Sequence, residues 1–320
     1  MKTLTSTLLK AGALLAAALA ATPAMAWDIC WTNCDFTRTK YPIVLEHGLA
    51  GFNELGGVLP YWNGIPENLR STGAEVYVTQ VSPFNSSVVR GESLIAQLDD
   101  IRAIKGNNSL KFNLIGHSQG GLDIRYVAAV RPDLVASLTT VGSPHKGSDL
   151  ITFDVNGQLV PTPATNAFSN FVSMVWSSLG GSPDPISITA VLKNFSPAGI
   201  AAFNASFPAG MPTTSCGQGQ AVTQTSAGPI RNYSWSGDAP FTNVYDPSDP
   251  AMVALSLFYD EPNDGLVERC ASHFGTVIRD NYRMNHLDEV NNLFGLTSVL
   301  EVDPRTLYRN HANRLKIAGL

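Results

Sequence analysis

The sequence predicts an α/β fold, with helices on both faces of a mostly parallel central sheet. Short apolar runs of strand length alternate with segments of helical periodicity, a pattern typical of this class. The chain has 320 residues and is 44% hydrophobic, so it can bury one large core. Residues 113–130, NLIGHSQGGLDIRYVAAV, place a tight G-x-S-x-G turn between an apolar run and a helical pattern. This turn suggests that the fold carries a serine nucleophile.

Local patterns justify each expected element. The segment 90–106 is predicted to be an amphipathic helix that Gly106 ends, because its apolar residues recur at spacings of three and four. A second helix is expected directly after Ser118, and a terminal amphipathic helix at 309–319. Buried strands are expected at 41–48, 75–81, 111–116, 137–144 and 252–260.

The first 26 residues resemble a secretory signal peptide. Lys2 and Lys10 precede an apolar run that is too short to span a bilayer and ends in Ala24-Met25-Ala26, a small-x-small cleavage pattern. We therefore expect a secreted protein that passes through the periplasm, with a mature domain at 27–320. The formal net charge is −5 and no basic cluster occurs, which argues against nucleic acid as a partner.

Export changes how the four cysteines are interpreted. In an oxidising compartment an even number of cysteines favours disulfides. Of the three pairings, the simplest joins Cys30 to Cys34 and Cys216 to Cys270. A zinc site is the competing interpretation, but the C-x3-C spacing has no matched pair of histidines, which makes it weak.

Residues 155–192 differ in amino-acid composition from the rest of the chain. They contain one charged residue, Asp184, and many Pro, Gly, Ser, Thr and Asn residues. The segment could hold an ordinary core helix or a mobile lid, at about 155–195, that covers an apolar cleft in water and opens on lipid. Its expected helix has one apolar face, made of Phe168, Phe171, Val172, Val175, Trp176 and Leu179.

A serine hydroxyl near neutral pH needs an imidazole to accept its proton and a carboxylate to orient that imidazole. In α/β-hydrolases these groups follow the chain order Ser, Asp, His, on loops at the carboxyl ends of strands. Ser118, Asp264 and His286 occur in this order, with Asp264 expected after the strand 252–260. Gly116 and Gly120 are the glycines that the tight turn requires.

The segment HGLAG at 47–51 follows an early strand, where α/β-hydrolases place one donor of the oxyanion hole. We assign the two donors to the backbone N–H groups of Leu49 and Gln119; the second begins a helix whose dipole favours negative charge. The remaining histidines are expected to have structural roles. His117 is expected to point away from the nucleophile, His145 to bond locally, and His273 and His311 to lie on the surface or in the packing.

Several stretches together resemble the secreted true lipases of bacterial family I, the Pseudomonas and Burkholderia type. They are YPIVLEHGLAGF, GHSQGG, RYVAAVRPDL, GSPHKGSD, NDGLV and VIRDNYRMNHLDEVN, which cover nearly the whole mature chain. The long C-terminal stretches are highly specific, whereas G-x-S-x-G alone is not. The resemblance assigns Ser118, Asp264 and His286 to the family's triad, and Leu49 and Gln119 to its oxyanion positions.

The resemblance also implies one structural calcium ion. Asp246 and Asp288 match its carboxylate ligands, and Asn292 and Leu296 match the residues whose backbone carbonyls complete the site; hard cations prefer such oxygen ligands. Asn292 replaces the Gln that is common in relatives. Cys216 and Cys270 match the family disulfide, whereas Cys30 and Cys34 depart from the family pattern. The family usually needs a dedicated foldase, and we expect a monomer that acts at a lipid–water interface.

Three functions are compatible with these residues. The favoured one is a triacylglycerol lipase that works through an acyl-enzyme and interfacial opening of a lid. A carboxylesterase for short soluble esters would use the same triad, but the apolar 165–181 segment favours lipid. A non-catalytic binding protein of this fold would require the Ser, Asp and His to lie apart in space.

Overall fold

The computed structural model describes residues 34–320, apart from 52–53, 56–58, 155 and 180–185. The expected signal peptide at 1–26 and Cys30 lie outside the described residues. Within the part of the chain that is described, no helix is both long and apolar enough to cross a membrane.

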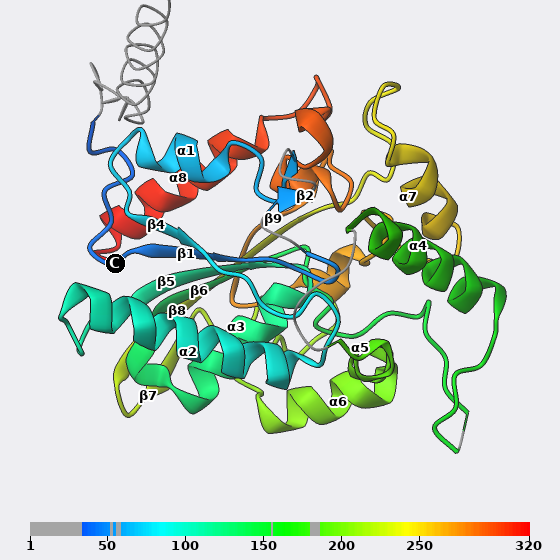
Figure 1. Ribbon diagram of the computed structural model, residues 1–320, viewed down its shortest axis with the longest axis horizontal. Coiled ribbons are helices and arrows are strands. Elements are labelled where there is room, and N and C mark those ends of the chain that lie inside the picture. Colours follow the sequence, from blue (N-terminus) through cyan, green and yellow to red (C-terminus); the bar gives the residue numbers. More distant parts are fainter. Residues whose placement is uncertain (1–33, 52–53, 56–58, 155, 180–185) are drawn as a thin grey trace, which may run out of the picture. The chain divides into compact units, whose positions relative to one another are not determined.

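A central sheet of seven strands organises the described chain (Figure 1). Its order is β4-β1-β5-β6-β8, and both β7 and β9 pair with β8. All pairs are parallel except β7 with β8. The strands are β1 (Ile43–Glu46), β4 (Val76–Val78), β5 (Phe112–His117), β6 (Val135–Val141), β7 (Val222–Thr225), β8 (Gly228–Gly237) and β9 (Thr276–Tyr282). A separate small hairpin joins β2 (Glu54–Leu55) to β3 (Leu59–Pro60).

Helices cover both faces of the sheet, so the predicted fold class is confirmed (Figure 1). Alternate side chains of β1 point to opposite faces, as a strand requires. Val44 packs in the core with α2 (Ser87–Lys105) and α3 (Gln119–Val130), whereas Ile43 and Leu45 pack with α1 (Ile65–Arg70) and α8 (Pro304–Ile317). The helix predicted at 90–106 is α2, which Gly106 ends with a φ of 61°.

The strand expected at 252–260 is wrong: this stretch begins inside the helix α7 (Asp249–Ser256) and continues as a turn. Pro250 suits the first turn of a helix, and the buried residues Met252 and Leu255 are spaced by three. Leu257 is 79% exposed, so the apolar run is not buried along its length. The sequence pattern also missed β8 and β9, which extend the sheet beyond β6.

The segment expected to form a lid is mainly helical. It comprises α4 (Pro163–Leu179) and α5 (Ile188–Phe195), and α6 (Pro197–Ser206) follows directly. Phe168 and Val172 are buried on α4, and Phe171 is half-buried against the same core. The side chains of Val175, Trp176 and Leu179 lie outside the described residues. Short 3₁₀ helices occur at η1 (Pro132–Leu134), η2 (Arg269–Ser272), η3 (Asp288–Val290) and η4 (Leu293–Gly295).

Candidate active site

Ser118 occupies a strained turn between β5 and α3. Its φ of 54° and ψ of −124° are unusual for a residue with a side chain, and such strain persists only where the surrounding structure enforces it. A side chain on Gly116 would collide with the backbone of Gly120, and one on Gly120 with the carbonyl of Glu46. The turn therefore requires glycine at both positions, as predicted, and it fixes the serine at the carboxyl end of a central strand.

His286 and Asp264 form a buried pair at the same end of the sheet. The Nδ1 atom of His286 lies 2.7 Å from Oδ2 of Asp264, whose side chain is fully buried. The other oxygen of Asp264 accepts hydrogen bonds from the backbone N–H groups of Leu266 and Val267. The Asp264 carbonyl also accepts the N–H of His286. The carboxylate is thus held in a closed loop and fixes the orientation of the imidazole.

Ser118 and His286 line one cavity of about 330 Å³. Leu49, from the HGLAG segment, lies in its wall, and Phe168, Phe171, Val172 and Met174 of α4 form another part. The remaining lining is also largely apolar, including Pro144, Ile151, Phe195, Pro247, Ala251, Leu266, Val267, Leu287 and Leu293. The structure thus places the candidate nucleophile, the candidate base and the candidate lid helix around a single apolar space.

Of the two expected oxyanion donors, Leu49 lines this cavity and Gln119 directly follows Ser118, which also lines it. Among the described residues, neither the Leu49 N–H nor the Gln119 N–H has a backbone acceptor. Arg90 helps to hold the HGLAG loop, because its guanidinium donates to the carbonyl of His47. Tyr61 holds the same loop, because its hydroxyl accepts the N–H of Gly48 at 2.9 Å.

His117, which the sequence predicts to point away from the nucleophile, lines the same cavity as Ser118. Its ring centroid is 4.6 Å from that of His286, its Nδ1 is 2.5 Å from the Tyr61 hydroxyl, and its Nε2 is 3.3 Å from Glu289. Burial lowers the pKa of His117 well below its usual value, and the nearby charge of His286 adds to this effect. Burial also raises the pKa of Glu289. Sequence reasoning missed Glu289, which no motif marks.

The ligand atoms of His117, His286 and Glu289 lie within 4.8 Å of one another, so this group could hold a metal ion. The other histidines serve the packing. His47 contacts the Gly48 carbonyl, and burial lowers its pKa to about 3. His145 lies 3.0 Å from the Thr140 hydroxyl, so its expected local bond is present, and His273 and His311 are buried.

Of the four residues expected to bind calcium, Asp246 and Asp288 lie close together, and Asn285 bonds to both. Asp246 and Asp288 are 5% and 1% exposed, and the side-chain amide of Asn285 lies 3.4 Å from Asp246. Asp249, which the sequence did not single out, accepts from the same amide at 2.8 Å. Burial and the nearby charges of Asp246 and Asp249 raise the pKa of Asp288 to about 7. Asn292 is buried and Leu296 is half-buried on the following turn.

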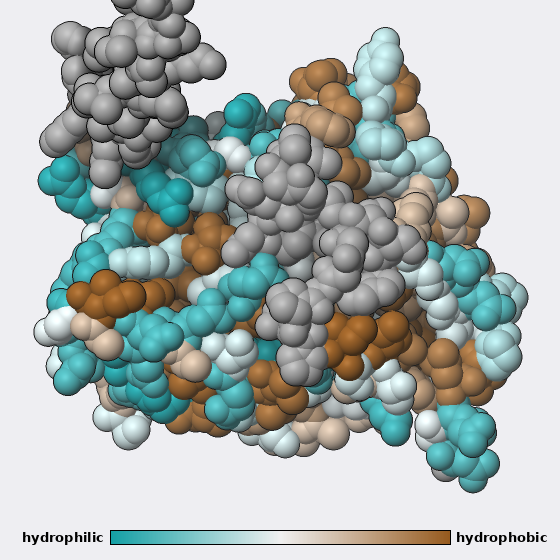
Figure 2. Space-filling view, viewed as in Figure 1, coloured by the Kyte–Doolittle hydropathy of each residue, from teal (hydrophilic) through white to brown (hydrophobic). Residues whose placement is uncertain are grey.

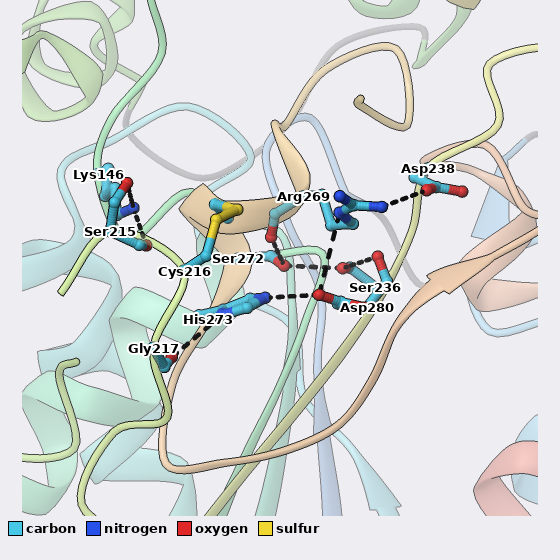
Figure 3. Close-up of a disulfide and its surroundings, with 11 residues drawn as sticks. Lys146, Ser215, Cys216, Gly217, Ser236, Asp238, Arg269, Ser272, His273 and Asp280 are labelled. Carbon is cyan, nitrogen blue, oxygen red and sulfur yellow. Dashed lines mark hydrogen bonds and ion pairs between the residues drawn. A yellow bond between two sulfur atoms is a disulfide. The ribbon is translucent and has the colours of Figure 1, made fainter. Parts of the chain in front are cut away.

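The Cys216–Cys270 disulfide is present, as expected, and it fastens the segment that follows Asp264 (Figure 3). Cys270 lies in η2, beside Arg269, whose backbone N–H donates to Pro262 just before Asp264. His273 bridges the same region, contacting the Gly217 carbonyl at 3.0 Å and Asp280 at 2.9 Å. The disulfide therefore connects a surface loop to the segment that positions the buried carboxylate.

Comparison with known proteins identifies the family. Residues 41–162 match the α/β hydrolase fold family. A triacylglycerol lipase from Vibrio cholerae is 50% identical over 289 residues, which span 89% of this chain and 90% of that protein. The chain belongs to the triacylglycerol lipases. It is therefore a serine ester hydrolase. A triacylglycerol lipase from Burkholderia plantarii is 40% identical to this lipase, over 89% of this chain and 88% of the relative.

Solved structures support the fold of this lipase. The mature form of a Bacillus licheniformis lipase superposes with a TM-score of 0.57 at 18% identity, covering 87% of this chain and 93% of that one. At that identity the likeness concerns the fold alone. The family assignment rests on the sequence relatives and agrees with the Ser118 turn, the His286–Asp264 pair and their shared apolar cavity.

Proposed function

We propose that Ser118 is the nucleophile of this lipase, His286 its general base and Asp264 the acid that orients His286. The Ser118 oxygen would attack the ester carbonyl carbon while His286 takes its proton. His286 would then give that proton to the departing alcohol, leaving an acyl-enzyme that water hydrolyses by the same route. The observation that carries the proposal is the 2.7 Å His286–Asp264 contact at a cavity that Ser118 also lines.

The oxyanion formed in each step would be bound by the backbone N–H groups of Leu49 and Gln119. Leu49 lines the cavity, and Gln119 directly follows Ser118 and begins α3, where the helix dipole adds a favourable field. Arg90 and Tyr61 would keep the Leu49 loop in place before substrate arrives, because they bond its two neighbours, His47 and Gly48. This arrangement supplies charge stabilisation with little reorganisation during the reaction.

The proposed substrate is a long-chain acyl ester at a lipid–water interface, and α4 is the proposed lid, within a region of about 155–195. The apolar cavity walls suit acyl chains, and the contribution of Phe168, Phe171 and Val172 from α4 supports a covering role. Lipid would shift the lid towards its open form, because only that form presents its apolar face to lipid. A carboxylesterase would not need this cover.

We further propose that Asp246, Asp288 and the carbonyls of Asn292 and Leu296 hold one calcium ion, which would pin the turn that carries His286. Their chemistry fits a hard cation: the donors are oxygens, and the two carboxylates are buried beside Asp249. Burial, and after it the charges of Asp246 and Asp249, raises the pKa of Asp288, and a bound cation would favour its charged form. The His117, His286 and Glu289 group is less suited, because two of its ligands are imidazoles.

Several remaining proposals rest on sequence. The signal peptide pattern at 1–26 supports secretion through the periplasm of a mature domain at 27–320. The family resemblance supports help from a dedicated foldase, and we expect a monomer. The Cys30–Cys34 disulfide also remains a proposal, supported by the short spacing and by export.

Ser118→Ala tests the proposed nucleophile against a matched control. The variant should lose about 10⁴-fold or more of its kcat on a soluble ester, because only binding and the oxyanion donors remain. Ser148→Ala removes a hydroxyl from the same cavity wall and should keep most of the activity. If Ser118→Ala retains a tenth of wild-type activity while folded, another residue is the nucleophile.

A further inference from the structure

We propose that this protein docks on neutral lipid through a fixed apolar surface that lies outside the lid. The proposal deepens the proposed lipase function and rests on it. The docking surface comprises six side chains from two segments, 241–245 and 294–300. They are Phe241, Val244, Tyr245, Phe294, Val299 and Leu300, with exposed fractions of 50%, 75%, 79%, 67%, 89% and 77%. Clusters of large exposed apolar side chains are rare on soluble proteins and mark sites of interaction.

The two segments form one surface. The side-chain amide of Asn243, in the first segment, donates to the carbonyl of Thr297, in the second, at 3.0 Å. The loop before α7 and the segment after β9 project side by side from the same edge of the molecule (Figure 1). Hydrophobic residues appear on both projections in the space-filling view (Figure 2).

This docking surface adjoins the mouth of the active-site cavity. Pro247 and Ser248, which closely follow the first segment, line that cavity, and so does Leu293, which directly precedes the second. A lipid surface that contacts the two projections would therefore lie next to the space that contains Ser118. This continuity is why we assign the occupant as the substrate phase.

The turn at 291–294, which leads into the second segment, has left-handed backbone at three residues other than glycine. Asn291, Leu293 and Phe294 have φ values of 55°, 45° and 67°, in the left-handed region that large side chains seldom adopt. Such strain tends to be kept where function uses it. Here it accompanies a phenylalanine that is 67% exposed instead of one that fills the core.

The charge of the docking surface selects neutral lipid. Residues 239–245 and 293–300 contain no Asp, Glu, Lys, Arg or His. Beyond their ends, Asp238 pairs with Arg269 at 3.3 Å, Asp246 is buried, and Glu301 pairs with Arg279 at 2.8 Å. Without basic residues the surface lacks the attraction that draws proteins to anionic headgroups, so burial of apolar area is its main source of affinity.

Adsorption to triolein droplets coated with phosphatidylcholine tests the proposal. All proteins carry Ser118→Ala, so adsorption is measured without hydrolysis and does not depend on the triad assignment. The test variant adds Phe294→Asn, Val299→Ser and Leu300→Ser; asparagine tolerates the left-handed region better than phenylalanine, so its melting temperature should not fall. The matched control adds Ile104→Ser and Ile317→Ser, which are 85% and 78% exposed on α2 and α8.

The test variant should adsorb at least about tenfold more weakly than the Ser118→Ala parent, and the control should match the parent. Adsorption of the parent should persist in about 1 M sodium chloride, which screens electrostatic attraction. With Ser118 restored, the three substitutions should leave hydrolysis of a soluble ester unchanged. Failure of the proposed function would show in that last assay, independently of adsorption.

Three results would overturn the proposal. Adsorption of the test variant within twofold of the parent would show that the surface does not bind lipid. An equal loss in the control would show that any exposed apolar residue contributes. Normal adsorption combined with a reduced yield of folded protein would assign the surface to a protein partner that handles the chain during export.

Discussion

Two buried acids share one guanidinium beneath the active site. Arg90 Nε lies 2.7 Å from Asp123 and Nη2 lies 3.6 Å from Glu46, and all three side chains are fully buried. Burial is the main cause that raises the pKa of Glu46 to about 8, with Arg90 opposing it, and the pKa of Asp123 rises to about 6. Glu46 therefore keeps its proton at neutral pH, and Arg90 remains available to hold the His47 carbonyl.

Glu46→Gln should change how stability depends on pH. In the wild type the folded state holds the Glu46 proton up to about pH 8, whereas the unfolded chain releases it near 4.5. The free energy of unfolding should therefore fall by roughly a few kcal/mol as pH rises across this window. The variant should lack this component in denaturation curves measured at several pH values. A difference between the two proteins that stays constant with pH would contradict the assignment.

Some site residues could be predicted from sequence because short sequence motifs determine their local geometry. Ser118 and its glycines belong to a turn that few other residues can form, and Asp264 and His286 follow in the chain order of the fold. Glu289, Asn285 and Asp249 carry no such signature. Their contacts join distant segments, and only the folded chain brings them together.

At the scale of elements, the apolar pattern predicted the helix α2 and the strands β1, β4, β5 and β6, and it failed at α7 and β8. The helix α2 follows its apolar spacing from one capped end to the other. The stretch 252–260 is nearly all apolar, so period alone could not separate a strand from α7. The strand β8 was missed because PIRNYSWS contains mostly polar residues, some of which are buried by the sheet instead of facing solvent.

The lid proposal predicts that two substitutions on α4 will affect lipid substrates selectively. Phe171→Ser with Met174→Ser removes apolar side chains that line the cavity, of which Met174 is 54% exposed. Hydrolysis of emulsified long-chain triglyceride should fall about tenfold or more, since the open lid loses area that lipid would bury. Initial rates on a soluble short-chain ester should fall far less. Equal losses on both substrates would mean that α4 is ordinary core.

At the scale of the whole molecule, distant segments are tied together around the His286 turn. Asp246 precedes α7, Asp288 follows β9, and Asn285 bonds to the carboxylates from both sides. The disulfide restrains the segment after Asp264 in a similar way. The alternating elements predicted this sheet in outline, but these ties depend on single side chains that pattern analysis does not rank.

Chelation of calcium should lower the melting temperature by about 2–4 °C or more, because a ligand that binds only the folded state stabilises it by mass action. It should also reduce activity, because the turn that carries His286 would no longer be held in place. Asp246→Ala should melt like the chelated wild type and respond little to added calcium. Asp100→Ala, an exposed acid on α2, is the control and should keep the calcium response. A melting temperature that is identical with calcium and with chelator would exclude the site.

The central claim is that Ser118 attacks the ester, and covalent trapping tests it most directly. A p-nitrophenyl alkylphosphonate mimics the ester and leaves its phosphorus bonded to the attacking oxygen, so mass spectrometry of the digested protein locates the nucleophile. We predict a single adduct on the peptide that contains Ser118, formed with loss of activity and absent from Ser118→Ala. An adduct on a different residue, or full inactivation with Ser118 unmodified, would contradict the account.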